Sequence, residues 1–137
     1  MEIRQYSVAK DGNRRLAPDF KVRELRCRDG TDTVMVDEAL TVVLQCIREH
    51  FGKAVTITSG YRTAAHNAAV GGAKNSQHLL GRAADIRVEG VSVEDVAAYA
   101  EQLMPDWGGV GRYPIKAGRA TGWVHVDTRA TKSRWTL

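Results

Sequence analysis

The order of the predicted helices and strands constrains the fold of this chain more than any other sequence feature. Apolar residues recur at helical spacing over 37–52 and over 92–103, which predicts two amphipathic helices. Four shorter segments are predicted strands, at 54–58, 83–88, 107–113 and 122–128. A fifth, at 63–70, is a predicted short helix. Because strands and helices do not alternate regularly, we predict an α+β fold with a small, mainly antiparallel sheet and flanking helices.

The length of the chain limits it to one domain. Its 137 residues fall within the roughly 100–150 that one domain usually contains. We therefore predict a single domain over 1–137, with an N-terminal arm at 1–19 and a tail at 129–137. Hydrophobic residues make up 43% of the chain and charged residues 26%, a balance that excludes disordered and collagen-like proteins.

Neither a membrane span nor an export signal is visible in the sequence. No apolar run approaches the roughly 20 residues that cross a bilayer, so we expect no membrane insertion. The first residues, MEIRQYSVAK, lack the apolar core of a signal peptide. We accordingly expect a protein without a signal peptide that stays in the cytoplasm until it is released.

The charge of the chain indicates an anionic partner. A net charge of +4 suits nucleic acid or a bacterial cell wall. Lys and Arg are scattered, however, and no aromatic stripe interleaves with them, so the pattern does not favour nucleic acid. Nothing in the surface pattern demands a dimer, and we expect a monomer.

The positions of two histidines raise the question of a metal site. His78 precedes a glycine turn, and Asp85 lies on the predicted strand that follows. Side chains alternate along a strand, so Trp123, His125 and Asp127 should share one face. Two imidazole nitrogens and one carboxylate oxygen form a possible zinc set with a fourth position for water. Scattered His and Asp residues are also common as ordinary hydrogen-bonded groups, so the spacing leaves both interpretations open.

Four segments stand in one consistent order along the chain: SGYRT at 59–63, GGAKNSQH at 71–78, GRAAD at 81–85 and WVHVD at 123–127. Together they resemble the zinc D-alanyl-D-alanine carboxypeptidase family of peptidoglycan peptidases. The resemblance is to its short, single-domain branch, which includes phage endolysins, and it extends from about Phe20 to Arg129.

The resemblance implies a zinc cleft in the α+β fold and a set of site residues. It implies that His78, Asp85 and His125 bind Zn²⁺. It also implies that Arg62 holds the scissile carbonyl or carboxylate of the substrate, since a guanidinium can make forked hydrogen bonds to an oxyanion. Ser76 is expected to contact the substrate or a metal ligand, or only to cap its loop.

The chain departs from the family pattern beside the last metal ligand. Several branches place a Glu general base three residues before that histidine, where this chain has Gly122, and another branch has a His where this chain has Trp123. Asp127 is the nearest replacement for the base. It could instead orient a ligand histidine, but we slightly favour the base role. Trp123 is expected to bind substrate as part of an apolar wall.

The sequence therefore predicts a zinc metallopeptidase that hydrolyses peptide bonds in the stem or cross-bridge of peptidoglycan around D-alanine. Carboxypeptidase and endopeptidase action of the endolysin type both fit. The missing signal peptide favours a phage or prophage origin, with action at the bacterial cell wall. One alternative is a catalytically inactive zinc-binding module of the cell wall, which Gly122 allows. Another is a basic nucleic-acid-binding domain in which His78 and Asp85 are ordinary loop residues.

Overall fold

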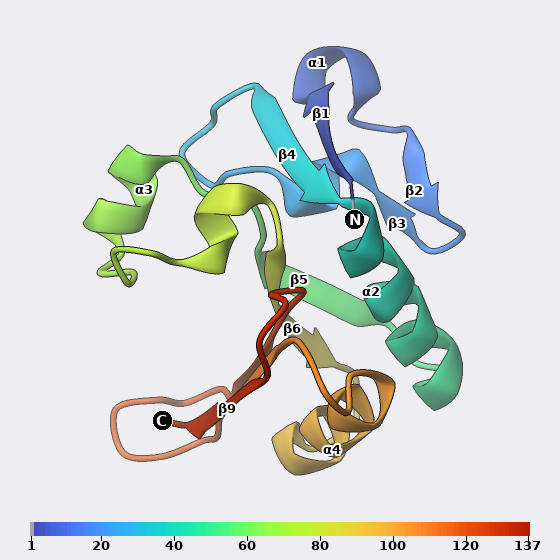
Figure 1. Cartoon of the computed structure of the whole chain (residues 1–137), viewed down its shortest axis with the longest axis vertical. Coiled ribbons are helices and arrows are strands. Elements are labelled where there is room, and N and C mark those ends of the chain that lie inside the picture. The colour runs from blue at the N-terminus through green and yellow to red at the C-terminus, as the bar shows by residue number, and fades with distance from the viewer. Residues whose placement is uncertain (1) are drawn as a thin grey trace.

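A five-stranded sheet lies at the centre of the computed structural model, which describes residues 2–137 (Figure 1). In spatial order its strands are β5 (Val55–Ser59), β6 (Ala83–Val88), β8 (Trp123–Asp127), β7 (Gly109–Tyr113) and β9 (Ser133–Thr136). All neighbours pair antiparallel except β7 and β9, which are parallel. The predicted α+β class with a mainly antiparallel sheet is therefore confirmed.

The helices begin and end where their capping residues stand. The α-helices are α1 (Val8–Asp11), α2 (Glu38–Phe51), α3 (Ala64–Ala69) and α4 (Val93–Leu103), and two 3-10 turns are η1 (Val22–Leu25) and η2 (Gln77–Leu80). The side chain of Asp37 accepts a hydrogen bond from the backbone N–H of Ala39 and caps α2, and Gly52 ends that helix in the left-handed conformation. Ser92 caps α4 in the same way.

The N-terminal segment, predicted as an arm, contributes strands to two small sheets. β1 (Ile3–Ser7) pairs with β4 (Thr33–Asp37), and β2 (Arg15–Ala17) pairs with β3 (Phe20–Lys21). Met1, the first residue of the predicted arm, lies outside the described residues. Sequence reasoning missed β4 because that strand runs into α2 without an intervening turn residue.

The C-terminal segment, predicted as a tail, forms the edge strand β9. Its residues pair in parallel with β7, so that Gly111 lies opposite Trp135. The sequence did not predict this strand, because the segment SRWT contains a single large apolar residue and shows no apolar–polar alternation.

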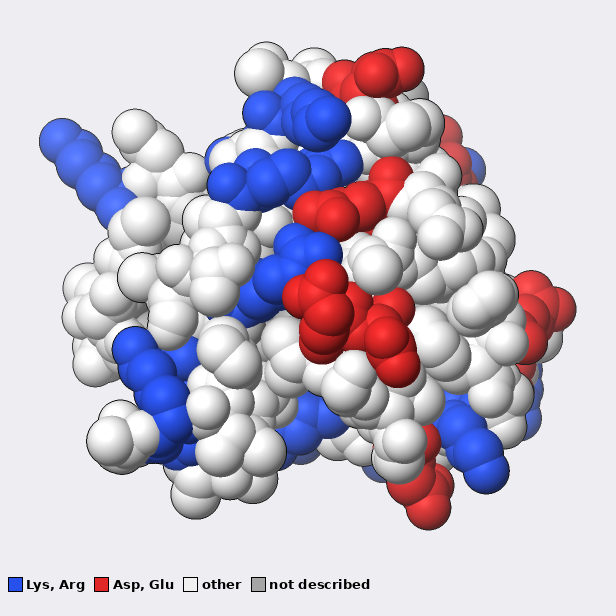
Figure 2. Space-filling view, turned by 90° about the horizontal axis from the view of Figure 1, so that it is seen from below, with Lys and Arg blue, Asp and Glu red and all other residues white. Residues whose placement is uncertain are grey.

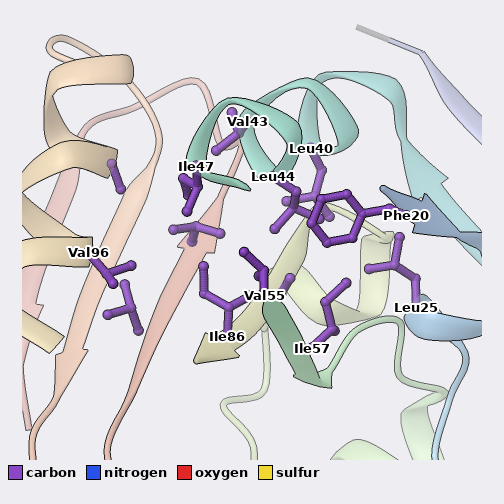
Figure 3. Packing of buried hydrophobic residues seen from close by; sticks show 14 of the residues in the cluster. Phe20, Leu25, Leu40, Val43, Leu44, Ile47, Val55, Ile57, Ile86 and Val96 are labelled. Atoms are coloured by element: carbon purple, nitrogen blue, oxygen red, sulfur yellow. The ribbon is translucent and has the colours of Figure 1, made fainter. Parts of the chain in front are cut away.

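The main hydrophobic core lies between the sheet and two helices, α2 and α4 (Figure 3). One face of α2 buries Leu40, Val43, Leu44 and Ile47, which pack in the same cluster as Ile57 and Ile86 of the sheet and Val96 of α4. Burying one such aliphatic side chain stabilises the fold by roughly 1.5–3 kcal/mol. Since side chains alternate along a strand, the residues next to Ile86, Val124 and Val126 face away from this core. Asp85 and His125 are thereby directed to the opposite face of the sheet.

A glycine in the left-handed conformation connects η2 to β6. Gly81 has φ of +73°, and a Cβ at this position would lie 2.3 Å from the carbonyl oxygen of Met35. Its own carbonyl accepts a hydrogen bond from the backbone N–H of Asp37 at 2.8 Å. Only glycine fits this conformation and this close approach, which together hold η2 against β4.

Charges of both signs are interspersed on the face shown in Figure 2. Arg112 of β7 forms ion pairs with Glu94 and Glu101 of α4 at 2.7 and 2.9 Å. Among residues 2–137, no helix combines the length and the apolar character needed to cross a membrane.

Candidate metal centre and substrate cleft

His78 lies on η2, and one hydrogen bond fixes the orientation of its ring. Nδ1 is 2.7 Å from the carbonyl oxygen of Gly60. A carbonyl oxygen can only accept, so Nδ1 donates to it, and Nε2 is the ring nitrogen directed at Asp85. Nε2 lies 3.3 Å from Oδ1 of Asp85. The hydroxyl of Ser76 accepts from the backbone N–H of His78 and caps the turn.

Asp85 and His125 face each other across the pairing of β6 and β8. Oδ1 of Asp85 is 3.0 Å from Nδ1 of His125. One ligand atom each from His78, Asp85 and His125 lies within 4.8 Å of the other two, and all three residues are buried. The structure thus brings together the three residues that were predicted to bind the metal.

Asp127 lies on the other side of the His125 ring from Asp85. Its Oδ2 is 2.8 Å from Nε2 of His125, and its carboxylate also accepts from the backbone N–H of Gly109 and from Arg129. Burial by itself raises the pKa of Asp127, but the hydrogen bonds from His125 and Arg129 outweigh it and hold that pKa well below its usual range. Asp127 is therefore an ionised carboxylate that accepts from Nε2 of His125, and Nδ1 is the ring nitrogen that faces Asp85.

The same balance of burial and hydrogen bonding controls Asp85 and His125. Burial raises the pKa of Asp85, but hydrogen bonds with His125 and His78 lower it well below its usual range. Burial lowers the pKa of His125, and its hydrogen bonds with Asp127 and Asp85 more than reverse that effect. Asp85 is therefore an ionised carboxylate, the form that can bind a cation.

Arg62 reaches the same carboxylate from the segment between β5 and α3. Its Nη2 is 3.4 Å from Oδ2 of Asp85, while Nε donates to Ser59 and Nη1 donates to Asn67. A guanidinium has five N–H donors, so these three contacts leave two donors for a substrate. The side chain is 14% exposed, which keeps it accessible but well ordered.

A cavity of about 770 Å³ opens beside these groups. This volume lies within the range of roughly 300–1,000 Å³ that is typical of ligand sites. Of the predicted site residues, those that line it are Arg62, Ser76, His78, Asp85, Trp123 and His125. Among the described lining residues, Asp85 is the single acidic side chain, and Asp127 does not line the cavity.

Aromatic side chains form another wall of the cavity. Trp123 stacks on Tyr113 with ring centroids 4.8 Å apart, and both residues line the cavity. Trp135 also lines it and donates from Nε1 to the Tyr113 hydroxyl at 3.0 Å. A Cβ at Gly111 would lie 2.5 Å from the Trp135 ring, so this glycine permits the close approach. Sequence reasoning missed Trp135, and the glycines of β7 were the available signal, since glycine within a strand often marks a close contact.

Comparison with known proteins identifies the family. The model of the peptidase M15 family matches residues 18–127, which include all four segments that carried the resemblance. The chain belongs to the peptidase M15 family. Its members are metallopeptidases, and this confirms both the resemblance and the predicted class of enzyme.

One relative bears a more specific name. The chain is 40% identical over 79 residues to the probable peptidoglycan L,D-endopeptidase MepK of Haemophilus influenzae. The aligned part covers 54% of this chain and 39% of that protein, so the chain spans about two-fifths of the length of its relative.

Proposed function

We propose that this chain is a zinc-dependent peptidase that hydrolyses peptide bonds of peptidoglycan, in the stem or cross-bridge around D-alanine, at the bacterial cell wall. The observation that carries the proposal is the convergence of His78, Asp85 and His125 on one point beside a cavity. Membership of the M15 family and the name of the Haemophilus influenzae relative support peptidoglycan as the substrate class.

The donor atoms fit zinc. Two imidazole nitrogens and one carboxylate oxygen, with a fourth position left for water or substrate, are a common catalytic zinc set. Each histidine is held in the tautomer that zinc needs, because its other nitrogen donates to Gly60 or to Asp127. When bound there, zinc would supply Lewis-acid activation of the scissile carbonyl and of the attacking water.

Arg62 has the position and the charge to hold the substrate. Its contacts with Ser59, Asn67 and Asp85 fix the guanidinium at the wall of the cavity. The two remaining donors can bind the carbonyl oxygen of the scissile peptide as negative charge develops on it. A donor that is fixed in advance for this purpose typically contributes about 10²–10³-fold in rate.

Asp127 serves in this proposal as a positioning residue for His125, in place of the general base that we slightly favoured from the sequence. A general base must come within hydrogen-bond reach of the proton that it accepts, directly or through one water. Asp127 has no exposed surface and does not line the cavity. Its oxygens already accept from His125, Gly109 and Arg129.

The aromatic wall offers the substrate an apolar surface with a polar edge. Trp123 and Tyr113 present stacked rings to the cavity, against which a peptide stem can pack. Because Trp135 donates to the Tyr113 hydroxyl, the proton of that hydroxyl remains available to the substrate. Ser76 also keeps its hydroxyl proton, since its oxygen accepts from the backbone of His78.

A second candidate function is a cell-wall-binding module that holds zinc without hydrolysis. It is favoured by the lining of the cavity, where no described acidic side chain other than Asp85 is available as a base.

Digestion of purified peptidoglycan, with mass spectrometry of the released peptides, separates the two functions. The peptidase predicts new peptide termini that disappear with a chelator and with Asp85→Asn. Sedimentation of the protein with peptidoglycan, without any released peptide across several wall types, supports the binding module instead.

A further inference from the structure

A second group of metal-ligating side chains lies outside the cleft, where the loop after η1 meets α3. Sγ of Cys27, a carboxylate oxygen of Asp29 and a ring nitrogen of His66 all lie within 4.8 Å of one another. Cys27 is buried, His66 is half-buried and Asp29 is exposed. None of the three lines the cavity beside His78.

Thr63 holds the three side chains of this group in place. Its hydroxyl accepts from the backbone N–H of His66 at 3.1 Å and donates to Oδ2 of Asp29 at 2.8 Å. Its own backbone N–H lies 3.5 Å from Sγ of Cys27. On the loop, Oδ1 of Asp29 accepts from the backbone N–H of Thr31 at 2.9 Å. The loop and the first turn of α3 are thereby joined with the three ligating groups side by side.

The ligating atoms retain capacity to bind an ion. Among residues 2–137, no side-chain or backbone group forms a hydrogen bond with the ring of His66. Each oxygen of a carboxylate can accept more than one contact, and the thiol of Cys27 is a weak hydrogen-bonding group that binds metals well as a thiolate. Arg28, the cation next to Cys27 in sequence, directs its guanidinium to the carbonyl oxygens of Glu24 and Ile57.

We propose that Cys27, Asp29 and His66 form a second Zn²⁺ site, separate from the catalytic centre. Thiolate, imidazole and carboxylate are the ligand types that proteins use for zinc, and three of them leave one position for water. A thiolate also selects against Mg²⁺ and Ca²⁺, which prefer oxygen ligands. The inference rests on the geometry of these residues and holds whether or not the chain is a peptidase.

The site would act on the cleft through the short segment 59–63. Within this segment Gly60 orients His78, Arg62 reaches Asp85, and Thr63 contacts the second group. An ion bound to Cys27 and His66 would fasten the loop to α3, and with it the backbone that carries Arg62. Its role is therefore to order the segment that supports the catalytic centre.

Titration of the metal-free protein with Co²⁺ tests the second site directly. A thiolate bound to Co²⁺ gives an intense sulfur-to-metal charge-transfer absorption in the near ultraviolet, which ligation by nitrogen and oxygen alone does not give. His78→Ala removes a ligand of the cleft site, so the titration is made in that variant. We expect it to bind one Co²⁺ per chain with the thiolate absorption.

Two further variants identify the ligands. His66→Ala, added to His78→Ala, should abolish the absorption. Because the His66 side chain is half-buried, the double variant should fold, and circular dichroism checks that it does. Cys46→Ala removes the other cysteine, on α2, and should leave the absorption intact. Asp29→Asn should weaken Co²⁺ binding at least several-fold.

A His78→Ala protein that is folded and shows no thiolate absorption at saturating Co²⁺ overturns the proposal, and the group is then a hydrogen-bonded cap of α3. Absorption that survives His66→Ala also overturns it. If the absorption appears as expected while the wild type releases no peptide from peptidoglycan, only the proposed peptidase function fails.

Discussion

Two groups of side chains in this chain each offer a metal ion three ligands: a cleft site of His78, Asp85 and His125, and a loop site of Cys27, Asp29 and His66. The ligands of the cleft site come from η2 and two paired strands, and both of its histidines are fixed by a hydrogen bond from the second ring nitrogen. The ligands of the loop site come from a loop and a six-residue helix. The cleft site is thus supported by strand pairing as well as by hydrogen bonds, while the loop site is held by the hydrogen bonds of Thr63. This difference suits catalysis at the first site and local ordering at the second.

Removal of a ligand should distinguish the two sites most strongly. Asp85→Asn weakens the metal site of the cleft and the ion pair with Arg62, so we expect peptidoglycan hydrolysis to fall by roughly 10³-fold or more, as the loss of several kcal/mol of transition-state stabilisation implies. The matched variant in the loop site, Asp29→Asn, should change hydrolysis only a few-fold. Rates of peptide release measured for both variants check this prediction, and equal losses would break the distinction between the sites.

The arginine of the cleft should show the next largest effect. Arg62→Lys keeps the charge but removes the fork that contacts Ser59, Asn67 and Asp85. We expect kcat/KM to fall by about 10²-fold with the zinc content unchanged. Arg15→Lys, at an exposed position outside the cavity, is the control. Loss of zinc in Arg62→Lys would show that this residue acts mainly on the metal site.

Asp127→Asn separates positioning from base catalysis. If Asp127 positions His125, zinc affinity should fall by roughly 10–100-fold, and added zinc should restore much of the hydrolysis. A general base would instead cost about 10²–10⁴-fold in kcat at saturating zinc and would remove the acidic limb of the pH–rate profile. Zinc titrations combined with kcat measurements across pH distinguish the two outcomes.

The smallest effect should appear in the pH dependence of stability. The pKa of Asp127 is lowered in the folded protein, so its stabilisation is fully present above the unfolded-state value of about 4 and is lost as pH falls through the folded-state value. In metal-free protein, the difference in free energy of unfolding between wild type and Asp127→Asn should therefore shrink as the pH is lowered from about 6 to 3. Urea unfolding at several pH values measures it.

Asp29 in the loop site provides the comparison for this pH effect. Hydrogen bonds from the side chain and backbone of Thr31, with others from Cys27 and Thr63, also lower the pKa of Asp29. Asp29 is exposed, however, and solvent screens its interactions. Asp29→Asn should change the pH dependence in the same direction by a smaller amount. A larger change than for Asp127→Asn would contradict the view that the cleft site is the better ordered of the two.

Much of the fold followed from local sequence patterns. The helix at 37–52 was predicted because apolar residues recur at helical spacing up to Gly52, and α2 has these bounds within a residue. The strand β9 could not be predicted, because its parallel pairing with β7 depends on a partner distant in sequence. The same holds for Trp135, which reaches the cleft only through that pairing.

The candidate site was partly readable from the sequence. Strand alternation placed His125 and Asp127 on one face, but it could not show which side of the imidazole ring Asp127 occupies. That position is set by hydrogen bonds from Gly109 and Arg129, which form only in the folded sheet. The loop site was not predicted either, since its ligands meet through tertiary contacts of Thr63.

Zinc content is the most direct test of the metal site formed by His78, Asp85 and His125. Wild type and His78→Ala, purified alike, are compared by plasma mass spectrometry for zinc per chain and by loss of turbidity of purified peptidoglycan. We expect the variant to contain one zinc ion fewer per chain and no longer to lyse peptidoglycan. Equal zinc content in the two proteins, or no stoichiometric zinc in the wild type, would contradict it.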